Sequence, residues 1–453
     1  MNAALKNLIQ NEPASKLRDW LALNPTVEVA EELSHLDSGD QALAFRLLRK
    51  DKAMAVFEAL DTEHQRTLLE GLREERVREL VEALPADDRA RLFDEMPAKV
   101  VARIQQGLSR EERDATARLL GYPAGSAGRV MLPVVTTVSA EQTREEALAR
   151  LSGQSERGGE LAVLPVTDGS RRLLGTVSLA DLVTAERGAV LSDLFTEDTY
   201  SVSAYEDQEA AARLIQEADL LALPVLDNEN RLLGMITVDD AMEILESEAT
   251  EDAYRSGGAE PIRRPYMAVT VFGLARSRAV WLLLLIVAAV LTVNVLEFFE
   301  DTLESMVVLA LFIPLLIDTG GNAGSQAASA MIRALAVGEV RFADLPRILW
   351  REARVGVLLG AMLAAVGFPV ASIFYGTDIG LIIALTLLFI CLWASAIGGI
   401  LPLVASKLRI DPAVFSAPVI TTVADATGLI IYFLIATAVL SDDLAMALPM
   451  IGG

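Results

Sequence analysis

The sequence predicts a protein of several domains: a superhelical array of short helices, a duplicated α/β module, an acidic connecting helix and five membrane-spanning helices. Three observations lead to this fold class. The 453 residues exceed the length of one ordinary domain. The chain is 52% hydrophobic yet has a net charge of -23, because charged residues dominate up to about residue 260 and apolar residues dominate from Ala279 onward. A segment of the charged half also occurs twice.

Residues 1–122 are predicted to form the helical array. Leucines recur at helical spacing, as at Leu68 and Leu72. Short breaks with acidic capping residues separate the helices, a pattern typical of superhelical arrays. The two histidines, His35 and His64, have no cysteine or second histidine close by in the sequence. We therefore interpret them as surface residues and not as metal ligands.

The repeat follows, with a first copy in residues 123–187 and a second in 188–240. Residues 164–168 lead into 172–181, and the similar residues 223–227 lead into 231–240. Each copy predicts two strands joined by a turn, then a helix that begins with Ser or Thr and Asp, which are favourable capping residues. An amphipathic helix precedes each pair of strands. The repeated unit is therefore a β-α-β-β-α module.

Residues 241–275 form the predicted connecting segment, which begins as an acidic amphipathic helix. Met242 and Leu245 line one side of this helix, and carboxylates crowd the rest. Carboxylates at such density repel one another. Cation binding would therefore change both their repulsion and their position.

Composition excludes several classes of function. The 62 acidic residues outnumber the 39 basic ones, so the charged half repels nucleic acid and attracts cations. The single cysteine, Cys391, excludes an internal disulfide and is interpreted as inert packing.

The sequence shows no nucleophile–base arrangement and no Gly-x-x-x-x-Gly-Lys motif, so an enzyme is not expected. The N-terminus lacks the pattern of a signal peptide, so we expect the charged half to be cytoplasmic.

Within residues 276–453, five stretches approach or exceed the roughly 20 apolar residues that a bilayer crossing needs. The segments before, between and after these stretches are alternately basic and acidic. Arginines precede the first stretch, and Asp442 and Asp443 follow the last. The fourth connection is basic, with Lys407 and Arg409. The positive-inside rule then predicts a multi-pass protein of the inner cell membrane with a cytoplasmic N-terminus and an external C-terminus. The predicted spans are 279–296, 306–334, 355–375, 380–408 and 415–440.

Polar residues interrupt the second and the last span. Asp318, Asn322 and Gln326 recur every four residues and so share one helix face, while Thr421 and Asp425 lie in the last span. A carboxylate near the centre of a bilayer costs at least a few kcal/mol unless it faces water, a partner or an ion. We favour a water-filled lining that passes cations. These oxygen donors suit Mg²⁺, although the chemistry does not separate Mg²⁺ from Mn²⁺, Ca²⁺ or Na⁺.

Glycines and prolines in the spans allow further interpretations. The glycines of the second span indicate either close helix packing or part of the cation path, and Gly398 and Gly399 in the fourth span favour packing. Pro402 and Pro418 are expected to break the helical ladder near the cytoplasmic side and to free carbonyl groups as ion ligands.

Several ordered motifs resemble a known family. The repeated unit resembles a tandem pair of cystathionine-β-synthase (CBS) domains, since both copies keep Gly-x-x-Ser/Thr-x-x-Asp. The whole chain resembles the MgtE-type magnesium channels, also called magnesium transporters, with an N-terminal helical domain, tandem CBS domains, a plug helix and five spans. The matching motifs lie at residues 120–123, 126–131, 237–240, 248–252, 320–326 and 424–428.

The resemblance implies a homodimer with a pore on its two-fold axis, between the second and last spans of both subunits, and a plug helix beneath it. Mg²⁺ would be both the transported ion and the ligand that closes the pore by bridging carboxylates. Asp425 would bind the ion, with Asn322 and backbone groups such as Gly321 supporting its hydrated form, and Asp318 and Thr421 would complete the lining. The implied regulatory ligands are Asp207, Glu209, Asp219, Asp239, Asp240, Glu243, Glu246, Glu248, Glu251, Asp87 and Asp94.

In CBS domains the last Asp of the motif often holds an adenosine ribose. The resemblance therefore implies ATP or another adenine nucleotide as a ligand of Asp181 and Asp240. Helix capping explains both residues equally well without a ligand. The first copy departs from the family at residues 158–162, where Gly-Gly-Glu-Leu-Ala replaces an aromatic strand, and this argues against a nucleotide there.

The favoured hypothesis is a magnesium-selective channel or transporter for Mg²⁺ influx that cytoplasmic Mg²⁺ closes. A second hypothesis is an H⁺- or Na⁺-coupled carrier of Co²⁺, Mn²⁺ or a solute, regulated by the CBS domains, with Asp318 and Asp425 as a proton relay. A third is a membrane-anchored sensing protein without transport. The expected partners are a second copy of the chain, the lipid bilayer and Mg²⁺, and no nucleic acid.

Overall fold

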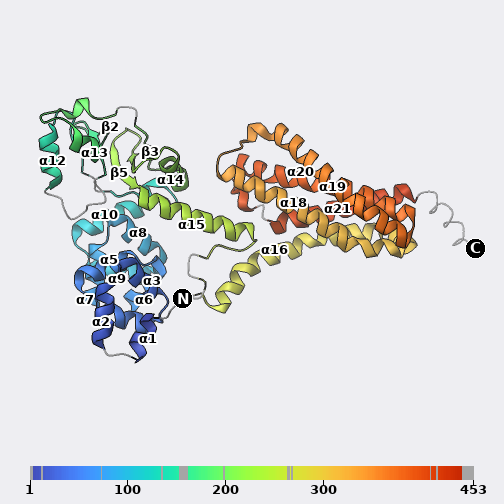
Figure 1. The fold of residues 1–453 in the computed structure, drawn as a ribbon, viewed down its shortest axis with the longest axis horizontal. Helices are drawn as coiled ribbons and strands as arrows, with labels where there is room; N and C mark the ends of the chain where they lie inside the picture. The colour runs from blue at the N-terminus through green and yellow to red at the C-terminus, as the bar shows by residue number, and fades with distance from the viewer. Residues whose placement is uncertain are drawn as a thin grey trace, which may run out of the picture. The chain divides into compact units, whose positions relative to one another are not determined.

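The computed structural model describes most of the chain and divides it into two compact units, Met1–Glu248 and Ala249–Gly453. Figure 1 shows the elements in chain order by colour. Three features of the sequence analysis lie outside the described residues. They are most of the segment 158–162, which differs from the CBS pattern, Arg409, and the acidic tail. The described residues are 4–11, 14–72, 74–133, 136–152, 162–196, 199–262, 266, 269–408, 410–414 and 417–440.

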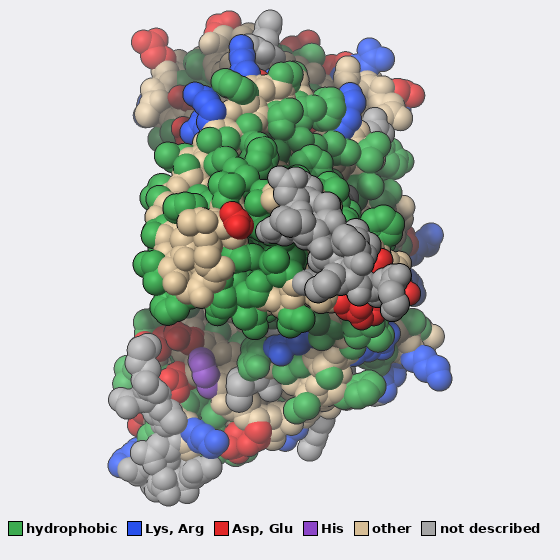
Figure 2. All heavy atoms as spheres, turned by 90° about the vertical axis from the view of Figure 1, so that its right-hand side faces the viewer, with side chains coloured by type: hydrophobic (Ala, Val, Ile, Leu, Met, Phe, Trp, Pro, Cys, Tyr) green, Lys and Arg blue, Asp and Glu red, His purple; other side chains and the backbone are tan. Residues whose placement is uncertain are grey.

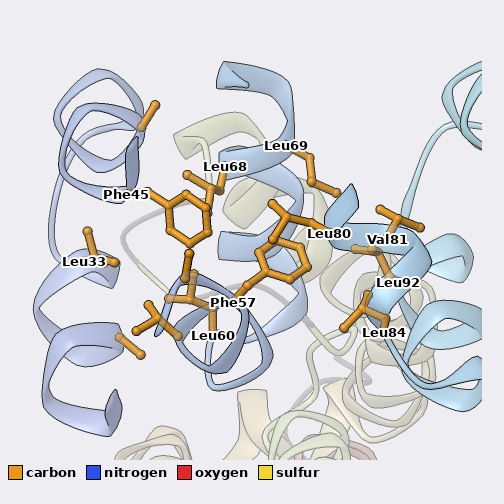
Figure 3. Close-up of a cluster of buried hydrophobic side chains, with 14 of the residues drawn as sticks. Leu33, Phe45, Phe57, Leu60, Leu68, Leu69, Leu80, Val81, Leu84 and Leu92 are labelled. Carbon is orange, nitrogen blue, oxygen red and sulfur yellow. The ribbon is translucent and has the colours of Figure 1, made fainter. Parts of the chain in front are cut away.

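The first unit begins with a stack of short helices, drawn in blue in Figure 1. Their buried faces form a continuous hydrophobic core, in which the rings of Phe45 and Phe57 meet edge to face at 6.3 Å (Figure 3). Asp61 caps one helix by accepting a hydrogen bond from the His64 backbone N–H at 2.9 Å. The predicted helical domain is confirmed. Its helices are α1 (Ala4–Asn11), α2 (Ala14–Leu23), α3 (Thr26–Ser34), α4 (Ser38–Arg46), α5 (Lys50–Glu58), α6 (Thr62–Gly71), α7 (Glu74–Ala83), α8 (Ala86–Glu95), α9 (Ala98–Gly107) and α10 (Arg110–Leu120), with α11 (Ala127–Val130) following.

Two α/β modules follow, as the repeat predicts. Strands β1 and β2 pair antiparallel in the first module; in the second, β3 is parallel to β4 and β4 is antiparallel to β5. Val166 lies opposite Gly175 and Val225 lies opposite Gly234, so the two hairpins share the same register. The elements are α12 (Arg144–Ser152), β1 (Val163–Thr167), β2 (Leu173–Ser178), α13 (Leu179–Thr184), η2 (Leu191–Asp193), β3 (Val202–Ser203), α14 (Gln208–Glu217), β4 (Ala222–Leu226), β5 (Leu232–Thr237) and α15 (Val238–Ser256).

The helix after each hairpin is capped by the predicted residues. Ser178 Oγ accepts a hydrogen bond from the Asp181 N–H at 3.0 Å and donates one to the Asp181 carboxylate at 2.6 Å. Thr237 Oγ1 donates to Asp240 Oδ2 at 2.6 Å. These short local bonds hold both aspartates at the start of their helices.

The second unit contains five helices that are long and apolar enough to cross a membrane, counted over the described part of the chain. Hydrophobic side chains cover much of the middle of the face in Figure 2. Helix α19 begins well before the predicted span, because Pro346 suits a first helical turn and the following Leu, Arg and Ala residues favour helix. The elements are α16 (Val271–Phe298), α17 (Glu300–Ser305), η4 (Val307–Phe312), α18 (Ile313–Ala336), η5 (Phe342–Asp344), α19 (Leu345–Tyr375), α20 (Thr377–Lys407), η6 (Pro412–Val414) and α21 (Ala417–Val439).

Glycines let the spans α18, α20 and α21 approach closely. A Cβ atom on Gly320 would lie 2.6 Å from Ile390 Cγ2, and one on Gly324 would lie 2.9 Å from Ile420 Cγ2. A Cβ on Gly398 would lie 2.9 Å from that of Ala327. The interpretation of these glycines as packing residues is therefore confirmed.

The expectation is wrong for Pro418 alone, because Pro402 lies in a helix interior and has no N–H to donate to the Gly398 carbonyl. Pro402 lies inside α20, which continues through it to Lys407, and Pro418 lies in the first turn of α21. A proline in the first turn of a helix removes an N–H group that would have no partner there, so it does not break the helix. The Pro418 carbonyl is also engaged, since it accepts a hydrogen bond from Thr422 Oγ1 at 2.9 Å.

Candidate ion pathway and cation-sensing acids

Helix α18 has one polar face that the rest of the chain leaves uncovered. Asp318, Asn322 and Gln326 are exposed on this face, whereas Gly321 and Ala323 on other sides of the helix are buried. Exposed carboxylate and amide groups within a span need water or a partner. The structure therefore places the three predicted residues on one helix face; their role in ion passage stays a prediction.

Asp425 faces α18 at a place where only glycine fits. A Cβ atom on Gly321 would lie 2.7 Å from Thr421 Cγ2 and 3.5 Å from Asp425 Oδ1. The Oδ1 atom is buried and has no hydrogen-bond partner, and no ion pair within the described residues involves Asp425. Asp318 is close enough to act on it electrostatically. An unpartnered carboxylate oxygen of Asp425 is thus left beside Gly321, within electrostatic reach of Asp318.

A chain of hydroxyl groups ties α18 to α21 next to this oxygen. Ser325 Oγ donates to the Gly321 carbonyl at 2.8 Å and lies 3.1 Å from Thr421 Oγ1. Thr421 Oγ1 in turn donates to the Ala417 carbonyl at 2.8 Å. The predicted lining residue Thr421 therefore positions helices as well as presenting an oxygen. Ser325 was not predicted as a site residue, although it lies within the 320–326 motif.

A second group of acids gathers where α8 of the helical domain meets α15. Asp87 is 6% exposed, and its Oδ1 atom is buried without a hydrogen-bond partner. Arg91, one turn further along α8, forms an ion pair with Glu243 and lies 3.5 Å from Asp240 and 3.7 Å from Asp88. The structure thus brings together the predicted residues Asp87, Asp240 and Glu243. The residue that sequence analysis missed is Arg91, since a single arginine in a charged helix carries no diagnostic signal.

The acids of this group resist full ionisation. Burial raises the pKa of Asp87 well above its ordinary range, and the charges of Asp240 and Asp88 raise it further. Burial raises the pKa of Asp88 to about 6; Arg91 opposes this change, and Asp240 and Glu243 add to it. Burial also raises the pKa of Asp240 against the effects of Thr237 and Arg91. These raised pKa values indicate repulsion among the acids. A cation that binds here would reduce that repulsion.

The other predicted regulatory acids have different surroundings, and of these Asp239 is next to Asp240 and acts on it electrostatically. Most already have partners within the chain, and three are exposed. Over the described part of the chain, no three or more His, Cys, Asp or Glu residues are placed to hold a metal ion. Asp94 pairs with Arg129, Asp207 accepts from the Glu209 N–H, Glu209 pairs with Arg213, Glu248 accepts from Gln208, Glu251 pairs with Arg255, and Asp219, Asp239 and Glu246 are exposed.

The end of α15 contacts the start of α21. Arg255 forms an ion pair with Asp411, whose other oxygen accepts a hydrogen bond from the Ala413 N–H at 2.8 Å. Gly258, with a φ of 68°, packs against Pro418: a Cβ atom there would lie 2.9 Å from Pro418 Cγ. The last turn of the acidic helix is therefore attached to the loop and helix that present Asp425. Sequence analysis missed this contact because its residues are far apart in the chain.

The two predicted nucleotide ligands have different surroundings. Asp181 is exposed at the start of α13. Asp240 is largely buried and belongs to the group around Arg91. The nucleotide role of both residues stays a prediction.

Comparison with known proteins matches most of the chain. The family model of the MgtE divalent cation transporters matches residues 313–435, that of the MgtE intracellular N domain matches 24–125, and that of the CBS domain matches 127–188 and 191–247. The chain is 35% identical to the magnesium transporter MgtE of Thermus thermophilus over 334 residues and 33% identical to that of Bacillus subtilis over 336 residues, in each case 73% of both chains.

A solved structure of the cytosolic domain of the Mg²⁺ channel MgtE in complex with ATP is 30% identical, with a TM-score of 0.50, and covers 54% of this chain and 100% of that one. The family models and the relatives agree with the order of domains seen in the structure. The chain belongs to the MgtE family of magnesium transporters, with an intracellular N domain and a tandem pair of CBS domains.

Proposed function

We propose that this chain forms a homodimeric channel that conducts Mg²⁺ into the cell and closes when cytoplasmic Mg²⁺ binds its acidic residues. The observation on which this rests is the buried Asp425 oxygen, open beside Gly321 within a membrane span. A cation offsets the cost of that carboxylate most simply. The curated relatives, named as magnesium transporters, support Mg²⁺ as the ion.

The polar face of α18 supports the homodimer. Asp318, Asn322 and Gln326 are uncovered in one chain, and lipid would not solvate them. A second copy that presents the same face across a two-fold axis would enclose a polar channel between the two chains. Such an isologous arrangement is the commonest way for identical chains to associate.

Two Asp425 carboxylates on one axis would suit a hydrated Mg²⁺ ion. Mg²⁺ gives up its water reluctantly and is usually held through one or two carboxylates. One aspartate from each chain provides two carboxylates, and the ion can keep most of its bound water. Inward movement needs no further energy source, because a divalent ion gains about 4.6 kcal/mol per 100 mV of membrane potential.

Closure would use the acids of the helical domain and α15. We expect regulatory Mg²⁺ to bind with most of its water shell kept, next to the Asp87 Oδ1 atom, which has no other partner, and within reach of the Asp240 charge. Binding there would favour the state in which α8 and α15 are close, and only its differential affinity for that state would shift the equilibrium. Through the ion pair of Arg255 with Asp411, a movement of α15 would move the start of α21. In this scheme the charged half faces the cytoplasm, as the positive-inside rule predicts.

Adenine nucleotide would be a second regulatory ligand, at the CBS pair. The related cytosolic domain that was solved with ATP supports this role. Of the two motif aspartates Asp181 is the exposed one, although it belongs to the first CBS copy, which departs from the family at residues 158–162.

Patch recording of the protein reconstituted in planar bilayers or giant liposomes tests the proposal. We expect discrete unitary Mg²⁺ currents that disappear as Mg²⁺ is raised on the side of the charged half. Saturable flux without unitary current would favour the coupled carrier instead. Absence of any Mg²⁺ flux from protein shown to be folded would overturn the proposal.

A further inference from the structure

An open apolar groove with a volume of about 500 Å³ lies between the spans α19, α20 and α21. Its lining includes Leu349 and Ala353 of α19, Trp393 and Ala396 of α20, and Leu434 of α21. No described residue that lines it belongs to α18, the helix with the uncovered polar face. The groove is therefore not part of the candidate ion pathway, and its lining matches a hydrocarbon chain.

An aromatic and a cationic side chain lie beside this groove on α19. Trp350 is 65% exposed, and it is one helical turn from both Ala353 and Arg354, so it lies between the groove and the arginine. The Arg354 Nε–H group donates a hydrogen bond to the Trp350 carbonyl at 3.3 Å. The guanidinium carbon is 5.7 Å from the centre of the Trp350 ring. The positive charge is thus held against an exposed tryptophan next to the groove.

Arg354 has unused hydrogen-bond donors at the edge of an apolar surface. Its guanidinium group carries several N–H donors, and among the described residues only the Trp350 carbonyl accepts one of them. Exposed Val355 and Leu358 follow Arg354 along the helix. Tryptophan and arginine are typical of the layer in which lipid headgroups meet the hydrocarbon core. An anionic group at that depth would accept charge-assisted hydrogen bonds from Arg354.

We propose that the groove and Arg354 together form a binding site for an anionic phospholipid of the leaflet in which α19 begins. One acyl chain lies in the groove, the phosphate accepts hydrogen bonds from Arg354, and the Trp350 ring packs between these two parts of the lipid. The apolar lining and the single cation select a ligand that is both hydrocarbon and anionic. The inference does not depend on which ion the protein conducts.

Native mass spectrometry of the delipidated full-length protein in detergent tests this site. The protein is offered equal amounts of palmitoyl-oleoyl phosphatidylglycerol and phosphatidylcholine, which have the same chains and differ in charge. We expect phosphatidylglycerol to be retained about fivefold better, which corresponds to about 1 kcal/mol for one basic residue near an anionic lipid. Arg354→Gln should abolish this preference. Its continued retention of phosphatidylcholine would show that the variant is folded and that the groove is intact.

Two further variants separate the parts of the site. Ala396→Phe fills the groove without changing a charge, so it should lower the retention of both lipids several-fold. Arg351→Gln is the matched control for Arg354→Gln. Arg351 is exposed on the same helix, but it is two positions from both Leu349 and Ala353 and so does not share their face. Its loss should leave the preference for phosphatidylglycerol.

Four results would overturn the inference. One is equal retention of the two lipids by the unaltered protein. Another is the same loss of preference in Arg351→Gln and Arg354→Gln, which would indicate a general attraction of anionic lipid to the basic start of α19. Displacement of the lipid by inorganic phosphate would assign Arg354 to a free anion. Disulfide-linked dimers of Trp393→Cys in a Cys391→Ala background would show that a second copy of the chain covers the groove.

Discussion

Among the residues that the structure describes, two aspartates have a carboxylate oxygen that is buried without a hydrogen-bond partner, and their surroundings differ. Asp87 lies one turn from Arg91, within a group where a guanidinium already offsets part of the negative charge. Asp425 lies within a membrane span beside Gly321 and the carboxylate of Asp318, and it forms no ion pair with any described residue. A buried acid with a neighbouring cation has less need of an added ion. One without a cation suits an ion that binds and leaves.

The largest effect is expected at Asp425. Asp425→Asn keeps the size of the side chain but removes its charge, so Mg²⁺ uptake into proteoliposomes should fall at least about tenfold, which corresponds to about 1.4 kcal/mol. Thr427→Val is the control, since Thr427 bonds only within α21, to the Val423 and Ala424 carbonyls. If Asp425→Asn left uptake unchanged, the Asp425 charge would not be needed for ion passage, and the contrast drawn between Asp425 and Asp87 would be wrong.

A substitution at Gly321 tests whether the unpartnered Asp425 oxygen depends on the close packing of α18 against α21. In Gly321→Ala the new methyl group would lie 2.7 Å from Thr421 Cγ2, so α18 and α21 must separate. We expect a loss of stability of about 1–3 kcal/mol and lower uptake, measured by thermal unfolding in detergent and by flux.

The matched control for this variant is Gly428→Ala. Its methyl group would meet Ile390 Cδ1 at an ordinary 3.4 Å, so little change is expected. Equal effects of the two substitutions would show that the position of Gly321 next to Asp425 has no special role.

Asp87 and Asp94 extend this contrast within the helical domain. Burial and the charges of Asp240 and Asp88 make the ionisation of Asp87 costly, so above its unfolded pKa of about 3.9 Asp87→Asn should raise stability without divalent ions by about 1 kcal/mol. Asp94→Asn instead leaves Arg129 without its carboxylate partner, so stability should fall by a similar amount, about 1 kcal/mol. Chemical unfolding of the full chain in EDTA measures both. A loss in both variants would mean that the Asp87 charge is stabilising.

The Arg255–Asp411 contact should connect the acidic helix to the helix that contains Asp425. Both side chains are partly exposed, so the pair contributes under about 1 kcal/mol. Arg255→Asp and Asp411→Arg should each shift the Mg²⁺ concentration that half closes the channel, and the double variant should restore part of the shift. Strictly additive shifts would show that the two residues act independently.

The smallest effect is expected from an ion pair at the surface of the helical domain. The hydrogen bond that the His64 ring donates to the Asp61 carboxylate raises the pKa of His64. Burial tends to raise the pKa of Asp61, but the hydrogen bonds from His64 outweigh it and lower that pKa. Protonated His64 therefore stabilises the fold fully below its unfolded pKa of about 6.5, and this contribution is lost as pH rises through the higher folded pKa. The Asp61 contribution is present above its unfolded pKa and is lost as pH falls through its lower folded pKa.

His64→Gln measures this contribution. At pH 5.5 it should lower the free energy of unfolding by about 0.5 kcal/mol, and at pH 9 by less. His35→Gln, at a ring that contacts only Ser34 and the Glu31 carbonyl, is the control. A larger loss at pH 9 would contradict the assigned direction.

Local patterns predicted most of the fold. Hydrophobic periodicity identified the short helices and the five spans, and the repeated Gly-x-x-Ser/Thr-x-x-Asp segment identified the two modules with their caps at Ser178 and Thr237. The start of α19 and the effect of Pro418 were predicted wrongly, because arginines near a membrane boundary and a proline in a first helical turn are both compatible with helix. Of the expected site, the sequence predicted the helix face of Asp318, Asn322 and Gln326 from spacing alone.

Residue types and their spacing along the chain were enough to predict which segments are helices, strands and spans, where the acids concentrate, and that a carboxylate lies inside the last span. The packing of the helices alone settles which acids meet. Asp87 joins Asp240 and Glu243 around Arg91, whereas Asp94 pairs with Arg129. It also decided that Gly321 leaves room for Asp425. Electrostatic and packing energies depend on distances between residues far apart in sequence, and those distances exist only once the helices have packed.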